Sequence, residues 1–127
     1  MGKVRTLVLI EDEPQQREVV QMMFEVEGYN VLSSNSAEEA LKYIEQSEPD
    51  VVVTDVKLTG MDGFSLFDHV RNTLQKDRLP FVFITGYNHP ETIEKMTKSQ
   101  GTAYVTKPYE PIDLLITVDK LISSNTM

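Results

Sequence analysis

The chain has 127 residues, no cysteine, and a formal net charge of −8 that results from 20 acidic and 12 basic side chains. This length fits one domain, the lack of cysteine excludes disulfides and thiolate chemistry, and the charge disfavours binding to nucleic acid or anionic membranes. The apolar run near the N-terminus is too short for a signal peptide or a membrane span, so we expect a single cytoplasmic domain over residues 1–127.

Strand and helix patterns alternate along the whole chain. The first half predicts a strand at 4–10, a helix from Pro14 to Gly28, a strand at 30–34 and a helix opened by a capping box at 36–39. The second half predicts strands at 50–55, 80–85 and 102–106, a helix that carries Phe67, Val70 and Leu74, a helix from Pro90 and a helix from Pro111 to about 123. The glycines of the segment 58–63 are expected to serve a turn after the third strand.

Five strands and five helices in alternation predict a doubly wound α/β domain. Strands that are joined through helices run parallel, with right-handed crossovers, and the helices then cover both faces of the sheet. The β-branched run at 50–55 is typical of a strand that is buried on both faces. In such sheets the functional groups gather where the strands end.

Polar side chains stand at four of these strand ends. Glu11 and Asp12 follow the first strand, Asp55 ends the third, Thr85 ends the fourth, and Lys107 follows the fifth. Taken singly, each has an ordinary interpretation as a helix cap, a turn residue or a solvated charge. Together they favour an all-oxygen site for Mg2+, because carboxylates that share a small site repel one another unless a cation is bound. One buried carboxylate is also a plausible acceptor for a phosphoryl group.

Four motifs, LVLIEDEP, VVVTDVKLTGMDG, FVFITG and AYVTKPYE, give the chain a resemblance to the response-regulator receiver family over almost its whole length. The resemblance implies a flavodoxin-like fold with strand order 2-1-3-4-5 and a role in two-component phosphorelay signalling. It also implies a histidine kinase or a histidine phosphotransfer protein as the phosphoryl donor. A receiver of this kind catalyses its own phosphorylation and dephosphorylation and is not a turnover enzyme.

The resemblance also assigns roles at the acidic site. Asp55 would be the phosphoacceptor and a ligand of Mg2+. Asp12 would ligate the ion directly, Glu11 mostly through water, and Lys57 through its backbone carbonyl. Glu11 stands where Asp is common, so its extra methylene shifts one carboxylate slightly.

The remaining roles concern the phosphorylated state. By resemblance, Thr85 and Lys107 would bind the phosphoryl oxygens, and the bond between Lys107 and Pro108 would be cis. Thr85 and Tyr104 would form a switch that alters the face made by the fourth helix, the fifth strand and the fifth helix, where a homodimer partner or an effector would bind. The fifth helix has more apolar residues than one buried stripe needs, which predicts that some of them face outward.

Two further side chains are predicted to tune the lifetime of an acyl phosphate. Lys57 lies two residues after the acceptor, and Tyr87 lies two residues after Thr85. In this fold both would overhang the phosphoryl group, where attacking water must approach. The alternative is that both side chains point into solvent.

Other functions fit the sequence less well. A metal-dependent phosphohydrolase with an aspartate nucleophile needs a D-x-D motif, which Asp55-Val56-Lys57 breaks. A flavin-binding module needs a phosphate loop rich in Ser, Thr and Gly where EDEPQ stands. A pseudo-receiver used only for docking would not need the full set of acids, threonine and lysine. A stand-alone regulator and a receiver from a longer regulator or hybrid kinase both fit the sequence.

Overall fold

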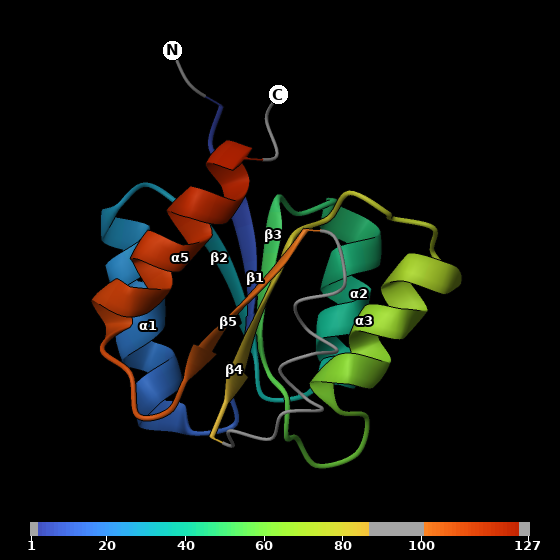
Figure 1. Ribbon diagram of the computed structural model, residues 1–127, viewed down its shortest axis with the longest axis horizontal. Coiled ribbons are helices and arrows are strands. Elements are labelled where there is room, and N and C mark those ends of the chain that lie inside the picture. Colours follow the sequence, from blue (N-terminus) through green and yellow to red (C-terminus); the bar gives the residue numbers. More distant parts are fainter. Residues whose placement is uncertain (1–2, 87–100, 125–127) are drawn as a thin grey trace.

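A parallel five-stranded sheet lies between two layers of helices in the computed structural model, which describes residues 3–86 and 101–124 (Figure 1). The elements are β1 (Thr6–Ile10), α1 (Pro14–Val26), β2 (Asn30–Ser34), α2 (Ala37–Ser47), β3 (Val51–Asp55), α3 (Gly63–Asn72), β4 (Phe81–Thr85), β5 (Thr102–Thr106) and α5 (Pro111–Ser124). The strand order is β2-β1-β3-β4-β5, so the predicted fold class and topology are confirmed. The helix predicted from Pro90 lies outside the described residues.

The two helical layers bury opposite faces of the sheet. Figure 1 shows α1 and α5 on one face and α2 and α3 on the other. Successive side chains of a strand point to opposite faces, so Leu7 and Leu9 pack with α1 and α5, whereas Val8 and Ile10 pack with α2 and α3. Every residue of β3 and β4 is buried, as expected for central strands of a parallel sheet. Among the described residues, no helix is long and apolar enough to cross a membrane.

Several predicted boundaries and one predicted cap differ from the structure. The strands predicted at 50–55 and 80–85 each begin one residue later, at Val51 and Phe81. The first strand begins at Thr6 and not at residue 4, because pairing with β2 begins at Thr6, which lies opposite Asn30. The third helix ends at Asn72, and Leu74 lies beyond it. The capping box of α2 is only half formed: the Ser36 hydroxyl accepts from the amide of Glu39, but the amide of Ser36 donates to Ser34 Oγ.

The strand register brings the predicted functional residues to one edge of the sheet. Ile10 pairs with Thr54, Asp55 pairs with Ile84, and Thr85 pairs with Thr106. The residues that follow these positions, Glu11 and Lys107 among them, therefore emerge at the carboxyl ends of neighbouring strands. A doubly wound sheet holds its functional site at this edge.

Candidate functional site

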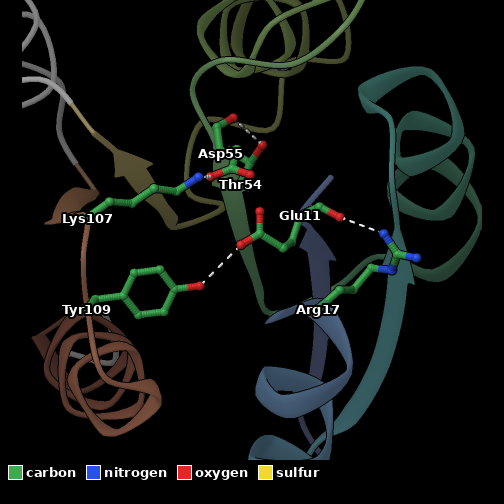
Figure 2. A network of polar contacts seen from close by, with 6 residues as sticks. All are labelled: Glu11, Arg17, Thr54, Asp55, Lys107 and Tyr109. Atoms are coloured by element: carbon green, nitrogen blue, oxygen red, sulfur yellow. Dashed lines mark hydrogen bonds and ion pairs between the residues drawn. The ribbon is translucent and has the colours of Figure 1, made fainter. Parts of the chain in front are cut away.

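Asp55 is a buried carboxylate at the end of β3, in contact with one cation. Its Oδ1 atom lies 3.0 Å from Lys107 Nζ, and only 2% of the Asp55 side chain is exposed (Figure 2). Lys107 is held at the end of β5, where its amide donates to the carbonyl of Thr85. Beyond the ion pair, no hydrogen bond from the described residues reaches either Asp55 oxygen. Asp55 thus has oxygen lone pairs that stay available inside the fold.

The backbone around Asp55 is fixed by the turn that follows β3. The amide of Val56 donates to the carbonyl of Ile84, and the amide of Gly63 donates to the carbonyl of Val56. A Cβ atom at Gly63 would collide with the carbonyl oxygen of Asp55, so glycine is required for this close approach. The turn role predicted for the glycines of 58–63 therefore has a direct physical reason, since the turn anchors the segment that carries Asp55.

Hydrogen bonds hold both the backbone carbonyl and the side-chain carboxylate of Glu11. Arg17 of α1 donates from Nη1 to the backbone carbonyl of Glu11 over 2.7 Å, and the hydroxyl of Tyr109 donates to Glu11 Oε1 over 3.3 Å (Figure 2). The other carboxylate oxygen, Oε2, is buried and has no hydrogen-bond partner among the described residues. A buried carboxylate oxygen without a partner is costly, which indicates that a cation or another donor belongs beside it.

Glu11, Asp12 and Asp55 together form a group that fits a divalent cation. One carboxylate oxygen from each lies within 4.8 Å of the others, and Asp12 is exposed while the other two are buried. All three offer hard oxygen ligands, and the site is open to solvent on the Asp12 side, so water can complete the coordination that Mg2+ requires. The unpartnered oxygens of Glu11 and Asp55 support this assignment independently of the cluster itself.

The electrostatics of the cluster also favour a bound cation. Burial is the main reason why the pKa of Glu11 is raised to about 8, and the neighbouring carboxyl of Asp55 is the next. Asp12 adds to this rise, whereas the ammonium of Lys107 opposes it. Burial lowers the pKa of Lys107, but contact with Asp55 and the nearby acidic charges outweigh that effect, and the pKa is raised overall. The ammonium is therefore firmly protonated, while the acids still carry more negative charge than one lysine balances.

Most of the predicted site residues line one cleft. Asp12, Asp55, Lys57, Thr85 and Lys107 all border it. Thr85 is buried at the end of β4, and Lys57 is exposed just after β3. The cleft thus places an ammonium and a hydroxyl-bearing residue around one buried carboxylate.

The remaining predictions concern Tyr104, the bond between Lys107 and Pro108, and Tyr87. Tyr104 lies on β5 opposite Phe83 and is 37% exposed. The peptide bond between Lys107 and Pro108 is cis. Tyr87 lies outside the described residues.

Two residues that contact Glu11 were not singled out from the sequence. Arg17 and Tyr109 reach it from α1 and from the segment after β5. Tyr109 directly follows the Lys107–Pro108 pair, so its place in the AYVTKPYE motif is a usable signal. No pattern in the sequence pointed to Arg17. Burial raises the pKa of the Tyr109 phenol above its usual range, so its hydroxyl keeps a proton to donate.

Comparisons with known proteins agree with this geometry. A family model for the response regulator receiver domain matches residues 7–119. An uncharacterized 14.6 kDa protein encoded in the sodA1 3′ region of Leptolyngbya boryana is 33% identical over 109 residues, which cover 86% of this chain and 83% of that protein. The transcriptional regulatory protein AfsQ1 of Streptomyces coelicolor is 32% identical over 105 residues, which cover 83% of this chain and 45% of AfsQ1.

A solved structure shows the same similarity in three dimensions. The crystal structure of a putative response regulator from Chloroflexus aurantiacus superposes with a TM-score of 0.84 at 29% sequence identity, and the match covers 95% of this chain and 99% of that chain. The chain spans most of the Leptolyngbya and Chloroflexus proteins but less than half of AfsQ1.

Proposed function

The chain belongs to the response regulator receiver family, and we propose that it accepts a phosphoryl group on Asp55 in a Mg2+-dependent reaction. The donor would be the phosphohistidine of a histidine kinase or of a histidine phosphotransfer protein. One observation carries the proposal: the buried carboxylate of Asp55 faces Lys107 at 3.0 Å within a group of three acids. This arrangement combines a nucleophile, a fixed cation and a metal-binding set at one point.

The proposed reaction is a transfer between a nitrogen and an oxygen. An Asp55 oxygen attacks the phosphorus, the phosphorus–oxygen bond forms as the phosphorus–nitrogen bond breaks, and the imidazole nitrogen keeps the electron pair. Lys107 turns from its ion pair with Asp55 to the oxygens of the arriving group. Thr85, which borders the same cleft, offers a hydroxyl to those oxygens. Mg2+, held by Asp12, Asp55 and Glu11, would neutralise part of the charge on the transferring group.

Incubation with acetyl phosphate tests the proposal directly. The wild-type protein should gain one phosphoryl group when Mg2+ is present, and mass spectrometry of the intact protein measures the gain. EDTA should block the reaction, because the acids would then repel both one another and the donor. Labelling that proceeds equally well in EDTA would contradict the metal requirement.

We further propose that the protein modifies itself and does not turn over an outside substrate. The cleft holds a nucleophile whose product would stay covalently attached, and the sequence lacks the D-x-D motif of aspartate-dependent phosphohydrolases. Sustained hydrolysis of a generic phosphate ester would favour the phosphohydrolase alternative and contradict this part of the proposal.

The lifetime of the phosphorylated form is expected to depend on Lys57 and Tyr87. Lys57 borders the cleft beside Asp55 and is exposed, so its ammonium can reach phosphoryl oxygens at the entrance used by water. Replacing both residues with alanine should shorten the half-life of the aspartyl phosphate severalfold, measured as loss of label after removal of the donor. An unchanged decay would mean that both side chains point into solvent.

The output surface is proposed to include β5 and α5. Seven apolar residues crowd α5, and the two at positions 112 and 116 are about half exposed, in line with the outward-facing residues that the sequence predicts. Tyr104 is exposed on β5, against which α5 packs. Withdrawal of Thr85 toward a phosphoryl group would leave space that the Tyr104 ring can fill, and a homodimer partner or an effector would read the changed surface.

Beryllofluoride, which mimics an acyl phosphate, tests this switch. Its addition with Mg2+ should shift backbone NMR signals well beyond the acids, into residues of roughly 86–116. Thr85→Ala should shrink these distant shifts while Asp55 still accepts a phosphoryl group, because the hydroxyl that is proposed to move toward the phosphoryl group is lost. Shifts confined to the loops around Asp12, Asp55 and Lys107 would contradict the switch.

A further inference from the structure

We propose that Tyr109 is a positioning residue of the metal site, which acts by fixing the carboxylate of Glu11 toward the bound cation. The inference rests on the proposed Mg2+-dependent function and adds a residue to it. Tyr109 contributes no ligand atom of its own. It acts through the contact between its hydroxyl and Glu11 Oε1, which joins residues 98 positions apart in the sequence.

The contact leaves one oxygen of Glu11 directed to the acid group. Oε1 accepts a hydrogen bond from the Tyr109 hydroxyl at 3.3 Å, while Oε2 is buried and has no hydrogen-bond partner among the described residues. Glu11 is also one of the three acids, with Asp12 and Asp55, that could hold a metal ion. Figure 2 shows the phenol and Asp55 on different sides of the Glu11 carboxylate. The phenol therefore occupies one oxygen and leaves the other for a cation or its water.

The hydrogen bond should strengthen metal binding for two reasons. A phenol that keeps its proton donates to an ionised carboxylate more strongly than to a neutral one, so the contact favours the form of Glu11 that a cation needs. It also holds a side chain with three rotatable bonds in one orientation, so less freedom is lost when the ion binds. Arg17 holds the backbone of the same residue at 2.7 Å, which leaves the carboxylate as the part that Tyr109 controls.

The length of Glu11 is what makes this contact specific. The Tyr109 hydroxyl reaches Glu11 from the segment after β5. The two residues border the same groove, together with Asp12 and Lys107. Shortening the side chain by one methylene in Glu11→Asp would draw the carboxylate back from a contact that is already 3.3 Å long. The effect of the Tyr109 hydroxyl should then depend on a glutamate at position 11.

Isothermal titration with Mg2+ tests the inference on the full chain. Tyr109→Phe removes one oxygen and is expected to weaken Mg2+ binding about tenfold, the lower end of the range for loss of a group that orients a metal ligand. In the Glu11→Asp background the same substitution should change the affinity little. Tyr29→Phe is the matched control, because it removes a phenol–carboxylate hydrogen bond of 3.1 Å, to Asp119, and should leave the affinity unchanged.

Thermal unfolding separates positioning from a general loss of stability. Without Mg2+, Tyr109→Phe and Tyr29→Phe should lose similar amounts of stability, whereas the rise in Tm on adding Mg2+ should shrink only for Tyr109→Phe. Wild-type affinity in Tyr109→Phe, or an equal loss in the Glu11→Asp background, would overturn the inference while leaving the proposed function intact. A wild-type protein that binds no Mg2+ would overturn both the inference and the metal requirement.

Discussion

Asp55→Asn is expected to abolish phosphorylation by acetyl phosphate while the protein stays folded. An amide oxygen is a far weaker nucleophile than a carboxylate, and the substitution keeps the shape of a side chain that is 2% exposed. Intact-mass measurement should therefore show one added phosphoryl group in the wild type and none in the variant. Asp68→Asn, an exposed position on α3, makes the same chemical change away from the cleft and should label like the wild type.

The same substitution should not reduce the stability of the metal-free protein. Asp55 loses its ion pair with Lys107, but the lysine is 42% exposed and water can solvate it, so that loss is small. In exchange, a buried charge without hydrogen bonds disappears, and so does its repulsion with the nearby carboxylate of Asp12. Urea unfolding in EDTA should give a free energy of unfolding equal to or above that of the wild type. Normal labelling of Asp55→Asn would show that the acceptor lies elsewhere.

The fold was largely predictable because its central strands carry unusually clear patterns. The β-branched run that ends in Asp55 is buried at every position, so one strand already indicates a sheet covered on both faces. Element ends were harder to predict because they depend on partners distant in the sequence. Val4 is apolar but 66% exposed, since β1 starts only where β2 can pair with it. Leu74 packs against the core although α3 has already ended, so its helical spacing was misleading.

The candidate site was predictable to the extent that it depends on backbone topology. Strand ends in a parallel sheet meet at one edge, so Glu11, Asp55 and Lys107 could be brought together from their positions alone. The orientation of each side chain was not predictable in this way. Side-chain rotamers and the packing of the helices decide two such contacts. Tyr109 contacts the carboxylate of Glu11, and Arg17 fixes the backbone of the same residue.

Glu11→Gln is expected to remove most of the pH dependence of stability between about pH 5 and 8 in the metal-free protein. The pKa of Glu11 is raised from 4.5 to about 8, chiefly by burial, so the folded protein keeps a proton that the unfolded chain has already released across this range. The unfolded state therefore binds fewer protons, and the stability of the wild type falls as the pH rises from 4.5 toward 8. Glutamine carries no charge at any of these pH values, so the variant lacks this loss.

The expected loss of wild-type stability over this pH range is about 1–2 kcal/mol, well below the full equivalent of the pKa shift, because water at the mouth of the cleft screens the charge. At pH 8 in EDTA, Glu11→Gln should be more stable than the wild type by about that amount, measured by urea unfolding, and the two should converge near pH 5. Glu13→Gln changes an exposed carboxylate in the same loop and should keep the wild-type slope.

Saturating Mg2+ should abolish the decline of wild-type stability with rising pH, because a bound cation holds Glu11 ionised and stabilises only the folded state. A slope that persists unchanged in Glu11→Gln would place the titrating group elsewhere and would contradict the raised pKa of Glu11.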